Sequence, residues 1–156
     1  MDPFVIFKYL HIVAMFFAVA LALSSELVVR RVATSGDVRA IRATVPRVRP
    51  LGNIATGLFL LGVVFGIVAA LTGQIDLLAP WLILAYVLFI SATLLGILVM
   101  DPWSARLEAA AVASQDDAAS DALRSVITEP AARAGSWALM VIVAALVFVM
   151  VVKPFA

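Results

Sequence analysis

Four long apolar segments constrain what this chain can fold into more than any other feature. They cover residues 4–29, 51–72, 81–100 and 136–152. A helix that crosses the hydrocarbon core of a bilayer needs about 20 such residues, and none of these segments alternates polar and apolar residues as a membrane strand does. The sequence therefore predicts an all-α, polytopic membrane protein, with four transmembrane helices in an antiparallel bundle that forms a single domain over residues 1–156.

Composition agrees with a bilayer and narrows the chemistry. The chain is 65% hydrophobic and 13% charged, whereas a soluble domain is roughly half apolar and about a quarter charged. Because there is no cysteine, a disulfide, a thiolate nucleophile and a cysteine metal site are all excluded. The arginines stand beside the apolar segments rather than on a basic face of their own, so nucleic-acid binding is not expected.

Orientation follows from the basic residues near the ends of the segments, because cytoplasmic loops carry the excess of Lys and Arg. Two connections that must share one side hold nine of the eleven basic residues, and the opposite side holds Lys8 and Lys153. The sequence therefore predicts a multi-pass protein of the bacterial inner (cytoplasmic) membrane with both termini outside. The nine are Arg30, Arg31, Arg39, Arg42, Arg47, Arg49, Arg106, Arg124 and Arg133.

Prolines predict where the helices begin. Pro3, Pro50, Pro80 and Pro130 stand at or just before the start of an apolar segment, where a missing N–H costs nothing. Asp2-Pro3 and Asp101-Pro102 both resemble an N-cap followed by proline at the first helical position. On this interpretation residues 30–50 form a loop, and no proline lies inside a span.

The third connection, residues 101–135, is predicted to be a cytoplasmic helical segment. Its alanine-rich part, 103–113, favours helix. Ser114-Gln115-Asp116-Asp117 resembles a capping box that opens a second helix, which Glu129-Pro130 ends. The segment is either a helical hairpin or an extension of the third and fourth spans. It is acidic and the first connection is basic, so the two either lie against each other or are solvated separately.

His11 and Glu26 are ionisable groups inside the first apolar segment. At about 100° per residue, His11 shares a helix face with Ala18 and Ala22, and small residues of this kind line the faces where membrane helices approach closely. We expect this face to point into the bundle. Glu26 lies one turn before Arg30, which favours an interfacial ion pair over a proton- or ion-carrying role.

Two interpretations of His11 are open. The favoured one is a neutral imidazole hydrogen-bonded to a neighbouring helix; the other is an axial ligand of haem b. Met150 lies at a similar depth, but about 140° around its helix from Ala138 and Ala145, the side expected to pack. A haem held by His11 and Met150 is therefore disfavoured, while a pair of His11 side chains across a dimer is allowed.

The second segment contains Gly62 and Gly66 at the spacing that lets two helix backbones come close together. We expect these glycines to pack against another helix of the same chain, in preference to a second copy.

Several of these elements resemble a bacterial family of predicted four-span integral membrane proteins of unknown function. They are Phe7-Lys8-Tyr9-Leu10-His11, Arg30-Arg31, the glycine-bearing second segment and Pro80-Trp81. Leu10-His11-Ile12 also distantly resembles the copper-resistance D proteins and the membrane-bound protoporphyrinogen oxidases. That distant resemblance implies a membrane histidine that binds copper or haem.

Catalytic constellations are absent from the sequence. It has no His-x-x-His pair, no paired intramembrane carboxylates and no Gly-rich phosphate loop. The sequence predicts a non-catalytic helix bundle without a metal site, which would act as an accessory subunit that packs against a larger membrane complex or a second copy of itself. A small-solute or ion transporter acting as an oligomer, and a b-type haem or metal-binding redox protein using His11, are the alternatives.

The predicted orientation can be tested with reporter fusions. Fusions at Gln74 and Ala156 are expected to report the outside, and a fusion at Gln115 the cytoplasm, because the basic residues cluster on the side of Gln115. A cytoplasmic signal at Ala156 would contradict the prediction.

Overall fold

The fold is entirely helical over the residues that the computed structural model describes, 2–114 and 118–155. In this part of the chain, four regions are long and apolar enough to cross a membrane, the third being continuous from Pro80 to Ala113 and the fourth lying within Asp121–Val152. The predicted all-α class with four candidate spans is therefore confirmed. The elements are α1 (Pro3–Ser35), α2 (Val38–Thr72), α3 (Pro80–Leu95), the π-helical turn η1 (Gly96–Met100), α4 (Asp101–Ala113), α5 (Asp121–Ile127) and α6 (Pro130–Val152).

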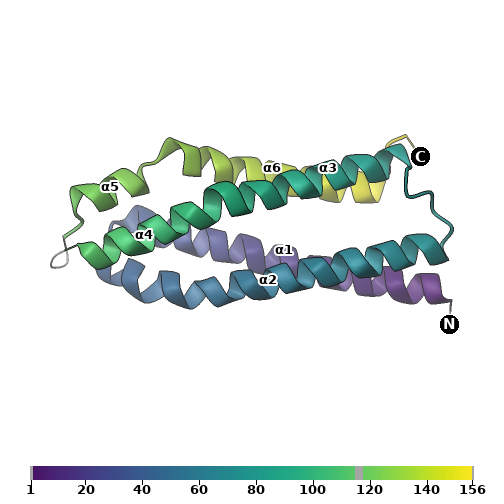
Figure 1. Cartoon of the computed structure of the whole chain (residues 1–156), viewed down its shortest axis with the longest axis horizontal. Coiled ribbons are helices and arrows are strands. Elements are labelled where there is room, and N and C mark those ends of the chain that lie inside the picture. Colours follow the sequence, from purple (N-terminus) through teal and green to yellow (C-terminus); the bar gives the residue numbers. More distant parts are fainter. Residues whose placement is uncertain (1, 115–117, 156) are drawn as a thin grey trace.

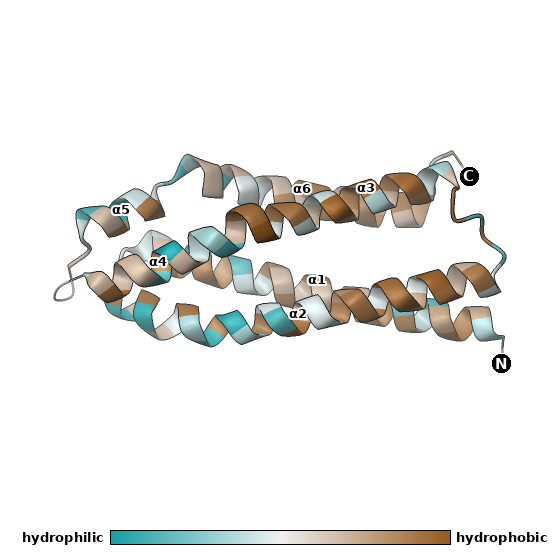
Figure 2. Ribbon diagram, viewed as in Figure 1, coloured by the Kyte–Doolittle hydropathy of each residue, from teal (hydrophilic) through white to brown (hydrophobic). Residues whose placement is uncertain are grey.

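The long helices form two pairs. α1 packs along α2, and α3 packs along α6, while α1 and α6 share only a small contact. Figure 1 shows that the two termini and the connection between α2 and α3 lie at one end of the molecule, which we call the terminal end. The α1–α2 turn, α4 and α5 lie at the opposite end. Figure 2 shows that hydrophobic residues dominate the terminal half and that hydrophilic residues gather toward the opposite end.

The start of α1 follows the sequence prediction. Asp2 is the N-cap, and its carboxylate accepts a hydrogen bond from the Phe4 N–H at 2.9 Å. Pro3 occupies the first helical position. The predicted cap at Asp2-Pro3 is confirmed.

The prediction of a loop over residues 30–50 is wrong. α1 continues to Ser35, and α2 begins at Val38 after Asp37, whose carboxylate caps the Ala40 N–H at 3.0 Å. Pro46 and Pro50 therefore lie inside α2. An interior proline costs about 3 kcal/mol. Burial offsets this cost, because Val38, Ile41 and Val45 are at most 1% exposed and each contributes about 1.5–3 kcal/mol.

The expected N-cap at Asp101 is also wrong. Asp101 has helical backbone angles, and its N–H bonds to the Gly96 carbonyl within a chain that stays helical from α3 into α4. Pro102 cannot donate to the carbonyl four residues earlier, and its ring crowds that carbonyl. The wider π-helical turn η1 accommodates the proline without ending the helix. Of the two forms proposed for the third connection, α4 is thus an extension of the third span.

The second short helix begins later than predicted. α5 starts at Asp121, where Ser120 is the N-cap and accepts from the Leu123 N–H at 3.2 Å. Ser114 is instead the residue that ends α4, and Gln115, Asp116 and Asp117 of the predicted capping box lie outside the described residues.

Buried apolar side chains hold the two pairs together at the end opposite the termini. We call this group the clamp core: Val29, Ala33, Val38, Ile41, Val45, Met100, Trp103, Leu107, Ala111, Leu123 and Ala132. It draws on α1, α2, η1, α4, α5 and α6. A smaller group lies at the terminal end, formed by Trp81, Leu82, Ala85 and Val149.

Charged groups reinforce the clamp core. Arg49 pairs with Glu108 at 2.7 Å, and the Arg42 side chain donates to the carbonyls of Ala111, at 2.7 Å, and Ser114. The basic first connection and the acidic third connection therefore lie against each other. Of the two alternatives drawn from the sequence, contact and separate solvation, the structure has contact.

The clamp core can be tested with Leu107→Ala. Leu107 is fully buried, so the variant is expected to lose about 2–5 kcal/mol of unfolding free energy, measured by denaturation in detergent. Leu98→Ala is the matched control, because Leu98 is 67% exposed on the same continuous helix. Equal losses in the two variants would contradict the assignment of the core.

Candidate functional site

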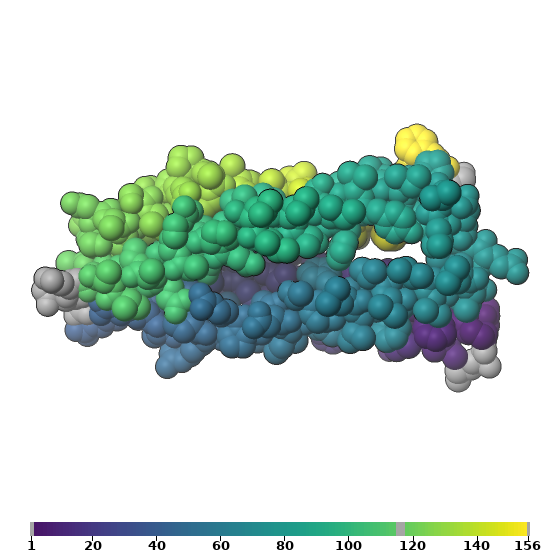
Figure 3. All heavy atoms as spheres, viewed as in Figure 1, coloured from purple at the N-terminus to yellow at the C-terminus, as the bar shows by residue number. Residues whose placement is uncertain are grey.

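A large cavity separates the two helix pairs. Its volume is about 1750 Å³, and side chains of α1, α2, α3 and α6 line it. Small-molecule sites usually measure about 300–1,000 Å³, so this cavity is larger than most. Figure 3 shows the molecule hollowed between α2 and α3 on the face in view. The lining is mainly apolar and includes Phe59, Phe89, Leu139, Leu146 and Met150.

Small residues on opposing helices leave this space open. Ala22, Gly52 and Ala55 line it from the α1–α2 pair, and Ala92 and Gly96 line it from α3 and η1. Contact between the pairs is concentrated in the clamp core. The cavity occupies the middle of the bundle, where the rings of Phe59 on α2 and Phe89 on α3 meet with their centres 5.8 Å apart.

His11 lines the cavity and bonds to the backbone of α2. Its Nδ1 lies 2.7 Å from the Gly62 carbonyl oxygen. A carbonyl can only accept, so Nδ1 carries the hydrogen and, in the neutral ring, Nε2 keeps its lone pair. The arrangement has the geometry of the favoured interpretation, and it also leaves one ring nitrogen for a ligand.

Gly62 and Gly66 of α2 face α1. A Cβ at Gly66 would lie 2.7 Å from His11 Nδ1, and one at Gly62 would lie 3.0 Å from the Met15 side chain. Ala18, on the same face of α1 as His11, is fully buried, while Ala22 is part of the cavity lining. The four small residues singled out in the sequence thus lie at the α1–α2 contact or beside the cavity.

The prediction that Met150 faces away from the packing side of its helix is wrong. It placed the packing side of the last helix on Ala138 and Ala145, yet Ala138 is exposed. Met150 instead lies beside the terminal-end core and lines the same cavity as His11. The buried residues of α6 are Ala132, Gly135, Ser136 and Val149, so the buried side includes neither Ala138 nor Ala145.

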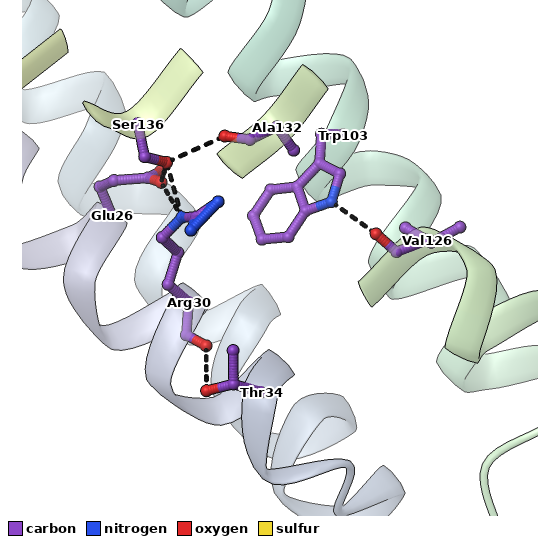
Figure 4. Close-up of polar contacts among 7 residues, drawn as sticks. All are labelled: Glu26, Arg30, Thr34, Trp103, Val126, Ala132 and Ser136. Atoms are coloured by element: carbon purple, nitrogen blue, oxygen red, sulfur yellow. Dashed lines mark hydrogen bonds and ion pairs between the residues drawn. The ribbon is translucent and has the colours of Figure 1, made fainter. Parts of the chain in front are cut away.

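Glu26 and Arg30 form a polar cluster with a residue of α6 (Figure 4). Arg30 Nε lies 3.3 Å from Glu26 Oε1 and donates to Ser136 Oγ at 2.6 Å, and the Ser136 hydroxyl bonds to Glu26 Oε1. The Arg30 guanidinium also lies over the Trp103 ring, 5.8 Å from its centre. The cluster therefore joins α1 to α6 and α4, and sequence analysis missed Ser136 and Trp103 because their partners lie far away in the chain.

Two lysines line the cavity at the terminal end. The Lys8 ammonium lies 5.4 Å from the centre of the Phe4 ring, and the Lys153 ammonium lies 5.2 Å from that of Trp81. All four residues line the cavity. In the sequence, these lysines indicated only the orientation of the chain in the membrane. Their position at the same end of the cavity depends on the fold, which brings the two termini together.

Acidic and histidine side chains do not cluster as metal ligands do. Among the described residues, no three of the His, Asp and Glu side chains come together in a group that could hold a metal ion. His11 is thus the one described residue of the cavity lining with an imidazole to offer a cofactor.

Four helices long and apolar enough to cross a membrane, with a cavity among them, are the features of a multi-pass integral membrane protein. The family model described as "Predicted integral membrane protein (DUF2269)" matches residues 5–154. The chain therefore belongs to the DUF2269 family, which confirms the family resemblance drawn from the sequence. No curated protein and no solved structure matches the chain.

The close contact between α1 and α2 can be tested by adding one methyl group. Gly66→Ala is expected to lower the melting temperature, because its Cβ would press on His11 Nδ1. Gly62→Ala should cost less, since the flexible Met15 side chain can move. Gly57→Ala is the control: nothing lies within 4 Å of its Cβ position, so it should be neutral or stabilising by up to about 1 kcal/mol. The opposite ranking of Gly66 and Gly57 in a thermal unfolding series would contradict the contact.

Proposed function

We propose that this protein is a non-catalytic membrane helix bundle that works by binding an amphiphilic lipid between its two helix pairs. The observation that carries the proposal is the apolar cavity of about 1750 Å³ with cationic side chains at its terminal end. Acyl chains would occupy the apolar middle, and the headgroup would lie beside the lysines.

The apolar middle suits hydrocarbon. Phe59, Phe89, Leu146 and Met150 line it from three helices, and a lipid chain would pack against the surfaces that these side chains leave exposed in the cavity. Contacts of this kind are individually weak but add up over a long chain. The cavity lies among helices apolar enough to span a bilayer, so a lipid would enter it from the surrounding membrane.

The charge at the terminal end favours an anionic headgroup. Lys8 and Lys153 line the cavity there, and each basic residue near a membrane surface attracts anionic lipid by about 1 kcal/mol. The acidic groups at this end accept hydrogen bonds from backbone N–H groups. Asp2 accepts from the Phe4 N–H, and Asp76 accepts from the Leu78 N–H, both at 2.9 Å. Neither belongs to the cavity lining, so the lysines remain available to a ligand.

Filling the cavity tests the proposal. Ala92→Trp places a large ring in the lining and is expected to reduce the phospholipid that co-purifies with each chain, measured by native mass spectrometry. Leu94→Trp is the matched control, because Leu94 is exposed on the same helix and does not line the cavity.

Lys8→Gln combined with Lys153→Gln should shift the bound lipid from anionic toward neutral species. Unchanged lipid in Ala92→Trp would contradict the proposal, and unchanged lipid preference in the lysine variant would contradict the role of the headgroup.

Haem b on His11 is a second candidate, and one observation favours it. Histidines that bind metals usually donate their other ring N–H to a carbonyl or carboxylate, which orients the ring. His11 Nδ1 makes this contact with Gly62 O at 2.7 Å, and Met150 lines the same cavity. A Soret band in the purified protein that His11→Ala removes would establish haem as the ligand in place of lipid.

The accessory-subunit role remains part of the proposal, because a lipid-binding bundle without catalysis can serve a larger membrane complex. Its small-residue surfaces, such as exposed Gly57 with no neighbour within 4 Å, allow close approach by another helix. Other chains that co-purify in mild detergent at constant ratio would support this role.

A further inference from the structure

A second, smaller pocket lies near the clamp core, between α1 and the start of α6. Its volume is about 300 Å³, and it shares no lining residue with the large cavity. The lining residues are Arg30, Thr34, Ile127, Thr128 and Arg133. We propose that this pocket binds a phosphate group through the guanidinium groups of Arg30 and Arg133.

Arg30 is held in place by one nitrogen, which leaves the others for a ligand. Nε makes the contacts with Glu26 and Ser136, and the two terminal nitrogens have no hydrogen bond with any residue the structure describes. Figure 4 shows the guanidinium anchored from the side of Glu26 and Ser136. A positioned guanidinium presents its N–H groups as a fork that matches the oxygens of phosphate.

Arg133 supplies the second cation and has no competing partner. Its side chain makes no hydrogen bond or ion pair with the part of the chain that the structure describes, and it is exposed. The carboxylates four residues before Arg30 and Arg133 already have partners. Glu26 binds Ser136 and Arg30, while Glu129 binds Arg106 at 2.7 and 2.9 Å. No Asp or Glu lines the pocket. Glu26 balances part of the charge of Arg30, whereas among the described residues Arg133 has no carboxylate partner.

The start of α6 adds to this positive field. Glu129 occupies the N-cap position without a side-chain capping bond, because its carboxylate is turned to Arg106. The first N–H groups of α6 therefore lack a side-chain acceptor, and a helix N-terminus attracts anions. Thr128 and Arg133, on either side of this start, both line the pocket.

The threonines shape the pocket rather than recognise the ligand. Thr34 Oγ1 donates to the Arg30 carbonyl at 3.0 Å, and Thr128 Oγ1 donates to the Arg124 carbonyl at 2.9 Å. Their hydroxyl hydrogens are therefore already used. A volume of about 300 Å³ is at the lower limit for small-molecule sites, which suits a phosphate group better than a nucleotide.

The phosphate can belong to a lipid headgroup or to a free anion, and the experiment separates these sources. Full-length protein in a neutral detergent is titrated with inorganic phosphate by calorimetry at low ionic strength. In parallel, protein in nanodiscs of mixed phosphatidylglycerol and phosphatidylcholine is assayed for enrichment of the anionic lipid. Arg133→Gln is the test variant, because the Arg133 side chain makes no hydrogen bond or ion pair with the described residues.

Arg124→Gln is the matched control: it removes the same charge nearby but does not line the pocket. We expect Arg133→Gln to weaken binding at least tenfold and Arg124→Gln to change it less than twofold. Arg30→Lys should also weaken binding, because it keeps the charge but loses the fork.

Loss of inorganic phosphate binding in Arg133→Gln would identify a free anion. Loss of phosphatidylglycerol enrichment alone would identify a headgroup. Equal responses of Arg133→Gln and Arg124→Gln in both assays would overturn the proposal. Ala92→Trp, which fills the large cavity, should leave phosphate binding intact, so the two sites can fail separately.

Discussion

Burial of Ile41, Trp103 and Leu107 at the end opposite the termini is the interaction on which the rest of the structure depends. These side chains are at most 2% exposed and join α2 to α4 within the clamp core. Helices surrounded by lipid gain nothing from hiding apolar surface, since lipid tails are as apolar as the side chains. The hydrophobic effect therefore acts where the helices extend toward water, and the bundle is closed there. In the middle, the pairs meet through the rings of Phe59 and Phe89, and both rings line the cavity.

Several arginine side chains in this structure connect one helix to another. Arg42 and Arg49 tie α2 to α4 beside the clamp core, and Glu26, Arg30 and Ser136 tie α1 to α6. A guanidinium nitrogen that bonds to another helix is not available to bind a ligand. Arg133 and the terminal nitrogens of Arg30 differ because, among the described residues, no helix contact uses them. Lys8 and Lys153 differ in the same way, because their partners are aromatic rings whose attraction leaves the ammonium protons available.

The sequence was sufficient for the number of spans and the first cap, since both depend on local composition. It was less reliable for α2, where Pro46 and Pro50 suggested a loop. The spacing of Val38, Ile41 and Val45 was a helical signal, but its strength became evident only through burial. The cavity could not be predicted, because it depends on the separation of helix pairs. The Gly62 carbonyl has no side-chain signature either, so the partner of His11 was unidentifiable, and Ser136 could be linked to Glu26 only across the fold.

The short turn between α1 and α2 has a consequence for how the chain is made. Only Gly36 and Asp37 separate the two helices, and Gly36 has the positive φ of 69° that the turn requires. Their mutual contacts begin beside the turn, so loop closure costs little entropy. α3 must wait for α6, which follows α4 and α5. Because chains fold from the N-terminus during synthesis, the first hairpin can assemble while the second is still being translated. The cavity therefore lies between a helix pair that can fold early, α1 and α2, and a pair that folds later, α3 and α6.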